Sequence, residues 1–259
     1  MRDKYVGDVG DYGKYGLLRA LASPPVPDGQ RNLSLGVVWY KVVGGDGTST
    51  EKPRATYGYL QQGESFRDCD QPLFEALKRV VQSKRKTVRT VELSGILPPE
   101  TAFYGVPLAT EGRELSPVAR LGKRARWVRG ALDHRQGHDI VFVDPDTGLD
   151  VGIRPQSEKA AKYAFFDELT PYLCRGQSLV IYQHLNPHYP LKGQVDQINE
   201  RIAEIKARLQ ASVAIALLFK PLPRRAFFIL PNKTDEDILS RRINRFLQGP
   251  WCEYFRRVG

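Results

Sequence analysis

Two carboxylates follow a short apolar stretch in the middle of the chain, in the run DIVFVDPDTGLD at 139–150. Asp144 and Asp146 flank Pro145, and Gly148 comes two residues later. A carboxylate at the end of a buried strand can accept a hydrogen bond from a substrate or bind a divalent cation. The same residues also suit a tight turn, because Asp and Gly tolerate turn conformations. The run is therefore either a structural turn or part of a catalytic or binding site.

A histidine follows the next apolar stretch, in YQHLNPH at 182–188. His184 is a candidate for proton transfer or for orienting a substrate beside the aspartates. His184 and His188 have the spacing of two metal ligands on one face of a helix, but Pro187 between them disfavours a helix there. The sequence therefore favours His184 alone as a catalytic candidate over a metal site shared by both histidines.

Two further features could bind a cofactor. Gly44, Gly45 and Gly47 form the loop GGDG after an apolar segment at 33–41. A glycine-rich loop after a strand cradles a cofactor in many folds, or simply turns the chain. Glu92 ends a second apolar segment, where an acid can bind a ribose hydroxyl or can stay solvated at the end of a strand.

Alternating strands and helices are expected to position these residues. Periodicity and composition predict buried strands at 33–41, 138–144, 177–184 and 212–219, and a half-buried strand at 86–93. They predict helices at 71–82, 117–135, 157–173 and 193–210. Strands that alternate with helices imply a mostly parallel sheet with helices on both faces.

The C-terminal part departs from that alternation. The segment 213–231 holds two strand-like runs joined by a short proline-rich link, too short for a helical crossover. The two runs must therefore form an antiparallel hairpin. We expect one α/β domain over 1–259, with inserted loops or a small subdomain at 42–70 and 94–116. In such sheets ligands bind outside the carboxyl ends of the strands, where Asp144, His184, Glu92 and the GGDG loop are all expected.

The charge of the chain indicates the class of partner. The 259 residues have a formal net charge of +10, and such an excess attracts polyanions, so nucleic acid is the expected partner. Basic residues gather in two places that could contact phosphates: Lys123, Arg124 and Arg126 in one predicted helix, and Arg224 and Arg225 at the hairpin link.

The cysteine content and the lack of long apolar runs indicate the cellular compartment of the protein. Three widely separated cysteines make neither a disulfide framework nor a cysteine-based metal site, which favours a reducing cytoplasm. No apolar run approaches the roughly 20 residues of a membrane span, and the first residues lack the apolar core of a secretion signal. We therefore expect a cytoplasmic protein with no membrane partner.

The run GDVGDYGKYGLLRAL at 7–21 resembles the opening motif of the methyltransferases that modify the exocyclic amine of adenine in large-subunit ribosomal RNA. In that family a Gly-Asn-x-x-Asp-x-x-Lys-His run precedes an apolar helix and helps to hold S-adenosylmethionine. Gly7, Asp8, Asp11 and Lys14 occupy the same spacing, with Asp8 in place of Asn and Tyr15 in place of His. The resemblance implies a Rossmann-like fold and methyl transfer to nucleic acid.

The chain departs from that family at the strand expected to be catalytic. The family has Asp-Pro-Pro-Tyr or a close variant there, in which the acid and the next carbonyl bind the target amine and the ring stacks on its base. Asp144 and Pro145 match, whereas Asp146 replaces the second proline and no ring follows. The extra aspartate keeps two alternatives open: a Mg²⁺- or Mn²⁺-dependent nuclease or phosphodiesterase that uses Asp144 and Asp146, and a nucleic-acid-binding protein without catalysis.

Overall fold

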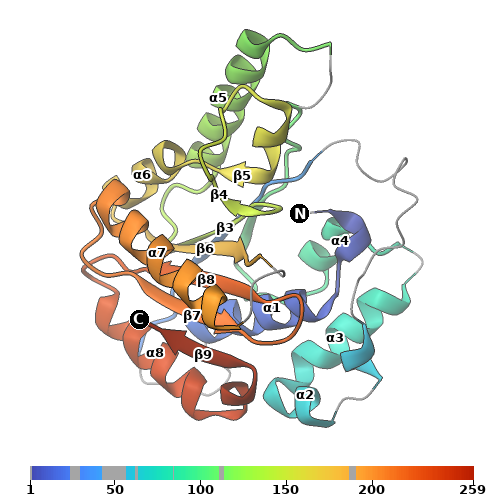
Figure 1. Ribbon diagram of the computed structural model, residues 1–259. Helices are drawn as coiled ribbons and strands as arrows, with labels where there is room; N and C mark the ends of the chain where they lie inside the picture. The colour runs from blue at the N-terminus through green and yellow to red at the C-terminus, as the bar shows by residue number, and fades with distance from the viewer. Residues whose placement is uncertain are drawn as a thin grey trace.

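A seven-stranded mixed sheet forms the centre of the protein (Figure 1). The computed structural model describes residues 2–23, 30–42, 57–61, 64–83, 85–110, 114–186 and 191–259. The strands run in the order β2-β1-β3-β6-β8-β7-β9. Their bounds are β1 (Leu35–Trp39), β2 (Ala102–Tyr104), β3 (Ile140–Asp144), β6 (Ser178–His184), β7 (Ile215–Phe219), β8 (Arg225–Leu230) and β9 (Phe255–Val258).

The sheet is parallel at one end and antiparallel at the other. Strands β2, β1, β3 and β6 run parallel, and β8 pairs antiparallel with both β6 and β7. β9 closes the far edge, antiparallel to β7. The expected α/β class, the mostly parallel order and the antiparallel hairpin of β7 and β8 are therefore confirmed.

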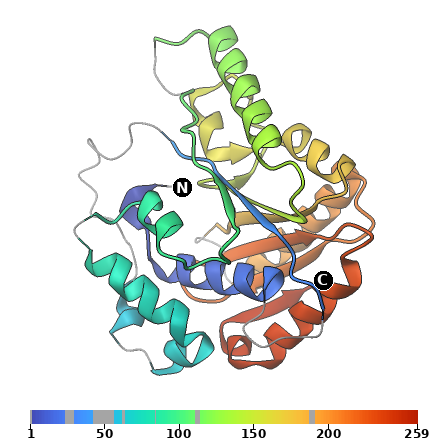
Figure 2. The ribbon, with the colours of Figure 1, turned by 180° about the vertical axis from the view of Figure 1, so that it is seen from behind.

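Helices cover both faces of the sheet (Figures 1 and 2). The first face is covered by α1 (Val9–Ala22), α3 (Gln71–Gln82), α4 (Val88–Leu93) and α8 (Glu236–Gln248), and the second by α5 (Pro117–His134), α6 (Phe166–Cys174) and α7 (Leu191–Leu209). The short α2 (Glu64–Cys69) lies beside α3. A separate two-stranded sheet, β4 (Gly148–Leu149) and β5 (Tyr163–Ala164), follows β3.

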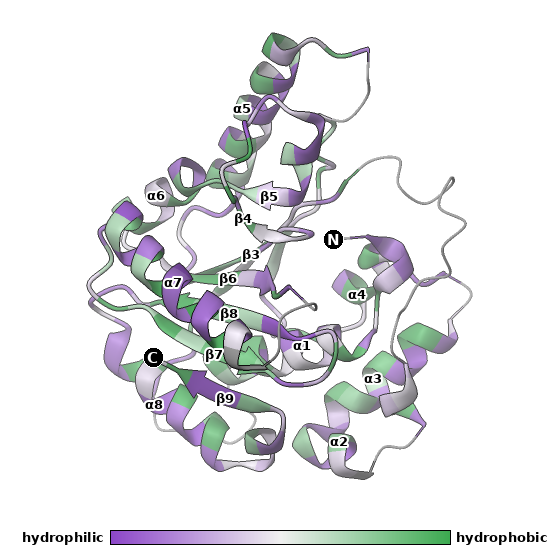
Figure 3. Cartoon of the chain, viewed as in Figure 1, coloured by the Kyte–Doolittle hydropathy of each residue, from purple (hydrophilic) through white to green (hydrophobic). Residues whose placement is uncertain are grey.

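Side chains alternate between the two faces along each central strand. In β1, Val37 and Trp39 join the core under α1, whereas Val38 joins the core under α5 and α6. A strand buried on both faces reads as a continuous apolar run, which is why the central strands were visible in the sequence. Figure 3 shows these strands as hydrophobic segments beneath helices of mixed character.

The segment 86–93, predicted as a strand, is helical. The hydroxyl of Thr87 caps α4 by accepting a hydrogen bond from the backbone N–H of Thr90 at 3.2 Å. Val88 and Val91, three residues apart, form the buried stripe of this helix. The edge strand beside β1 is instead β2, which lies inside the segment 94–116, where inserted loops or a small subdomain are expected.

The single helix predicted at 157–173 is three elements. A 3-10 turn, η3 (Glu158–Lys162), leads into β5, and α6 begins only at Phe166. The C-terminal α8 and β9 had no counterpart among the predicted elements. None of the helices in the described part of the chain combines the length and the hydrophobicity of a membrane span.

Candidate functional site

The N-terminal motif organises the start of α1. Asp8 is the N-cap residue, and its Oδ1 accepts a hydrogen bond from the backbone N–H of Asp11 at 2.9 Å. Asp11 Oδ2 accepts one from the N–H of Gly7 at 2.9 Å, and Gly7 has a positive φ of 79° that favours glycine. Lys14, one turn further on, donates to Asp11 Oδ1 at 2.9 Å. The spacing of the motif thus fixes a carboxylate–ammonium pair on the first turns of the helix.

Lys14 also reaches the sheet. Its Nζ donates to Asp144 Oδ2 at 3.0 Å, and Asp144 is the last residue of β3. The side chains of Lys14 and Asp144 are 4% and 3% exposed, so the pair is screened from bulk water. The expectation that Lys14 and Asp144 lie together at the carboxyl edge of the sheet is confirmed.

Burial and charge set the protonation of this pair. Burial raises the pKa of Asp144, and the neighbouring ammonium of Lys14 opposes part of that rise. Burial acts to lower the pKa of Lys14, but the carboxylates of Asp11 and Asp144 outweigh it and hold the pKa above its usual value. Lys14 therefore stays charged at neutral pH.

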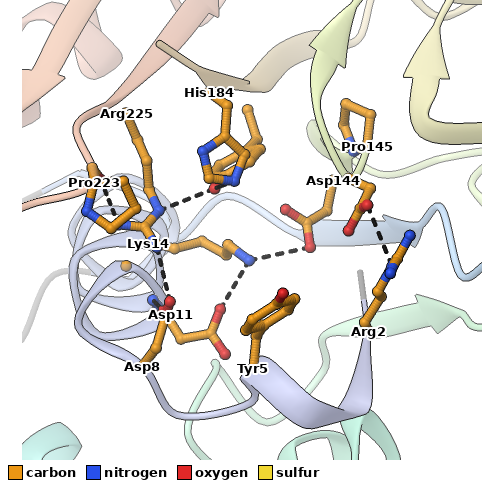
Figure 4. Close-up of a pocket in the computed structure, with 13 residues that line it drawn as sticks. Arg2, Tyr5, Asp8, Asp11, Lys14, Asp144, Pro145, His184, Pro223 and Arg225 are labelled. Atoms are coloured by element: carbon orange, nitrogen blue, oxygen red, sulfur yellow. Dashed lines mark hydrogen bonds and ion pairs between the residues drawn. The ribbon is translucent and has the colours of Figure 1, made fainter. Parts of the chain in front are cut away.

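A cavity of about 280 Å³ opens above this pair (Figure 4). The residues that line it come from the N-terminal segment, α1, the ends of β3 and β6, and the start of β8. They are Arg2, Tyr5, Asp8, Gly10, Asp11, Lys14, Asp144, Pro145, Asp146, Tyr182, His184, Pro223 and Arg225. Four aspartates face three basic side chains, so the wall is slightly acidic although the whole protein is strongly basic. Each of these aspartates is paired with one of the three cations: Asp146 with Arg2, Asp11 and Asp144 with Lys14, and Asp8 with Arg225.

A hydrogen-bonded chain runs along the opposite wall of the cavity. Arg225 forms an ion pair with Asp8 at 2.8 Å and donates from Nε to the Tyr182 hydroxyl at 2.9 Å. The Tyr182 hydroxyl lies 2.9 Å from His184 Nε2. Burial, reinforced by the charge of Arg225, lowers the pKa of His184 to about 4. The imidazole is consequently neutral at physiological pH.

A second and larger cavity, of about 610 Å³, adjoins the first. His184 and Pro223 line both cavities, so they form the shared wall. The second cavity lies between the β4 and β6 region and α7, and Tyr163 and Asn186 are among its lining residues. The two spaces together provide room for a ligand larger than the first cavity alone could hold.

The basic residues expected to contact nucleic acid are divided between surface and interior. Arg126 is exposed and Lys123 half-buried on α5. Arg124 is only 3% exposed, and its guanidinium binds the Glu168 carboxylate and the carbonyls of Ala160 and Tyr163. Arg124 therefore links α5 to η3, β5 and α6 through these contacts. This differs from the expectation that it is an exposed residue that contacts phosphates.

Of the two hairpin arginines, Arg225 also differs from that expectation. Arg225 is 4% exposed and belongs to the cavity wall described above. Arg224 is half-buried, and its NH1 donates to Gln194 Oε1 at 3.3 Å. The Arg225 guanidinium is thus enclosed by its partners, whereas Arg224 remains partly accessible.

Glu92, the expected cofactor residue of the second apolar segment, is not among the residues that line the cavity. Glu92 lies on α4, where Oε1 accepts a hydrogen bond from Trp39 Nε1 at 3.1 Å and Oε2 binds Arg89. Glu92 is thus near the end of β1 but does not end a strand. Gly44, Gly45 and Gly47, and with them His188, lie outside the described residues.

The alternative metal site finds no support in the described ranges. No group of three or more His, Cys, Asp or Glu side chains there is arranged to hold a metal ion. Asp146 instead forms an ion pair with Arg2 at 3.3 Å. The two aspartates of the DPDTG run therefore have different cationic partners, although both line the cavity.

Several lining residues were not anticipated. Tyr182 could have been found, because it precedes His184 by two residues and so lies on the same side of β6. Arg2, Tyr5 and Pro223 had no recognisable signal in the sequence. Gly10 admits Arg225 to the wall, because a β-carbon at this position would lie 2.1 Å from the Arg225 guanidinium carbon.

Comparisons with known proteins add little to this geometry. No family model matches the chain, and no curated protein matches it. Among solved structures, the crystal structure of protein LPL1258 from Legionella pneumophila, of the DUF519 family, is similar with a TM-score of 0.42 and 10% identity, over 98% of this chain and 96% of that one. Function must therefore be inferred from the cavity itself.

Proposed function

We propose that this protein is an S-adenosylmethionine-dependent methyltransferase that acts on an exocyclic amine of a nucleic-acid base. The observation that carries the proposal is the position of Asp144. It ends a parallel strand at the edge of the cavity, one oxygen is anchored by Lys14, and Pro145 follows at the cavity wall. An oriented carboxylate beside a backbone carbonyl is suited to accept both hydrogens of an amine.

The chain's own residues would orient the acceptor amine. Asp144 accepts one amine hydrogen and the carbonyl of Pro145 the other, which turns the nitrogen lone pair toward the methyl donor. Bound S-adenosylmethionine supplies a methyl group on a sulfonium, an electrophile that needs an aligned nucleophile more than a strong base. Holding the two in line is the main contribution of such a site to the rate.

The residues at the cavity fit that cofactor in chemical terms. The wall has one more carboxylate than basic side chains, which suits a sulfonium and an α-amino group, and Arg2 would exchange its Asp146 partner for the cofactor carboxylate. The mostly parallel sheet with an antiparallel hairpin of β7 and β8 is also the layout expected of Rossmann-like methyltransferases. Both observations support the proposal.

The distribution of positive charge supports nucleic acid as the substrate. Part of α5, together with η3 and the small β4–β5 sheet, forms a projecting lobe above the central sheet (Figures 1 and 2). This lobe, residues 117–129 and 148–164, presents Lys123, Arg126, Arg129, Lys159 and Lys162. A basic lobe beside an acidic cavity separates two tasks, because phosphates would bind the lobe while a base enters the cavity.

Methyl transfer from radiolabelled S-adenosylmethionine to RNA and to DNA, each from cells that lack the protein, tests the proposal. We expect incorporation with the natural chain and a loss of about 100-fold or more in Asp144→Ala and Asp144→Asn. Asp133→Asn, at an exposed position on α5, is the matched control and should retain full activity. Unchanged transfer in the Asp144 variants would refute the assignment, and nucleic-acid binding without any transfer would favour the non-catalytic alternative.

A further inference from the structure

The Tyr182 hydroxyl determines the tautomer of His184. Its oxygen accepts a hydrogen bond from Arg225 Nε at 2.9 Å. The guanidinium can only donate, so the hydroxyl proton must point to another acceptor. The ring nitrogen His184 Nε2, also at 2.9 Å, is the acceptor that the structure provides. Since Nε2 accepts, the proton of the neutral imidazole is on Nδ1.

The Nδ1–H group is the part of His184 left for a ligand. The described residues provide no hydrogen-bond partner for Nδ1, and the side chain lines both cavities. Tyr182, which holds His184, is itself held by Arg225, and Arg225 is paired with Asp8 at the cap of α1. His184 is thereby a fixed hydrogen-bond donor on the wall between the two cavities.

Asp144 provides the complementary acceptor in the same cavity. Lys14 occupies its Oδ2, and in Figure 4 the second carboxylate oxygen is turned toward the side on which His184 lies. Among the described residues, none donates a hydrogen bond to this second oxygen. One cavity thus offers an acceptor from β3 and a donor from the neighbouring β6.

We propose that this pair recognises a nucleobase edge on which an exocyclic amine adjoins an unprotonated ring nitrogen, as in adenine and cytosine. Asp144 accepts a hydrogen bond from the amine, and His184 Nδ1–H donates one to the ring nitrogen. Hypoxanthine and uracil are rejected because a carbonyl replaces the amine and would face the Asp144 carboxylate. This inference rests on the proposed function, and it assigns a specificity-determining role to His184 and a positioning role to Tyr182.

Nucleoside binding to the full chain tests the pairing directly. Calorimetric titrations would use adenosine, 1-deazaadenosine, 7-deazaadenosine and inosine, and in parallel cytidine, 3-deazacytidine and uridine. S-adenosylhomocysteine at saturation would fill any adenosine subsite of the cofactor. We expect adenosine or cytidine to bind at least about 10-fold more tightly than its carbonyl analogue and than the deaza analogue that lacks the contacted nitrogen. The preferred series distinguishes adenine from cytosine.

Three variants separate recognition from mere packing. His184→Phe should bind the parent nucleoside and its deaza analogue equally, because the donor is gone. His184→Asn should keep the discrimination, since the amide nitrogen takes the place of Nδ1. Tyr182→Phe should weaken discrimination without changing the binding of the deaza analogue.

The contrary results are equally definite. Equal binding of parent and deaza nucleosides by the natural chain, or no nucleoside binding at all, would overturn the inference. So would discrimination that persists in His184→Phe. Nucleoside discrimination without S-adenosylhomocysteine binding or methyl transfer would support the inference while refuting the proposed function, so the two failures can be told apart.

Discussion

Lys14 and Asp144 lie 130 residues apart in the sequence, yet their side chains meet at 3.0 Å and are almost completely buried. The contact joins the first helix to the end of the central strand β3. A buried ion pair is costly to form, and losing one partner leaves the other charge without compensation. The main role of the pair is therefore to fix the position of the Asp144 carboxylate, and its net contribution to stability is small.

Replacing Lys14 tests this role. Lys14→Met leaves Asp11 and Asp144 buried without their shared cation, and we expect the free energy of unfolding at neutral pH to fall by about 3–5 kcal/mol. Urea denaturation followed by circular dichroism measures the decrease. Lys206→Met, at an exposed position on α7, is the control and should change the free energy by less than about 0.5 kcal/mol.

A double variant identifies the cause of that decrease. Adding Asp144→Asn to Lys14→Met removes one uncompensated charge, so we expect the double variant to recover part of the free energy of unfolding. If the double variant is as unstable as the effects of the two single variants added together, the pair is not energetically coupled.

The neutral state of His184 predicts how stability depends on pH. Unfolding restores a pKa near the ordinary 6.5, whereas the folded value is about 4, so between these values the unfolded chain binds more protons. The free energy of unfolding should therefore decrease as the pH falls from about 6.5 toward 4. His184→Asn removes this contribution, and between pH 7.5 and 5 it should lose about 1–3 kcal/mol less than the natural chain. Denaturation of the natural chain and of His184→Asn at both pH values measures the difference.

Two arginines two residues apart on α5 should respond differently to the same change. Arg124 is enclosed by Glu168 and two carbonyls, so Arg124→Met should lower the free energy of unfolding by about 3 kcal/mol or more. Arg126 is exposed, so Arg126→Met should lower it by less than about 0.5 kcal/mol. Chemical denaturation compares the two, and similar decreases would contradict the burial of Arg124 in its network.

The projecting lobe makes a separate prediction about nucleic-acid affinity. Lys123→Gln and Arg126→Gln each remove one positive charge from α5 and should weaken binding to unrelated sequences to a similar degree. The slope of log affinity against log salt concentration should decrease by roughly one for each phosphate that the variant no longer neutralises. Fluorescence anisotropy at several salt concentrations measures this. An unchanged slope in the double variant would place the nucleic acid elsewhere on the protein.

The parts of the fold that sequence reasoning located well are those with an unambiguous period. β1, β3, β6 and β7 are buried, except for His184 at the end of β6, and read as apolar runs. Asp144 at the end of β3 meets Lys14 of α1 at one edge of the sheet, as expected. At 86–93 the apolar residues fit either period over so short a length, and the Thr87 cap decided for a helix. The amino-acid sequence of so short a segment does not distinguish a helix from a strand.

For the basic residues, the sequence did not reveal which side chains are buried. Arg124 and Arg225 look like surface cations in the sequence, but their acidic partners, Glu168 and Asp8, are 44 and 217 residues away. Only the tertiary fold reveals that these guanidiniums are enclosed. The candidate site gained Arg225 and Tyr182 in this way, because the antiparallel pairing of β6 with β8 sets them beside each other.

The direction of β8 has a consequence for how ligand choice could change. Because β8 runs against its neighbours, its beginning rather than its end arrives at the cavity, together with the turn that joins it to β7. Pro223 in that turn already borders both hollows. Residues can be inserted or exchanged in this turn without altering the register of either strand. The turn at the rim of the cavity could therefore vary in length and composition while the contact between Asp144 and Lys14 stays unchanged.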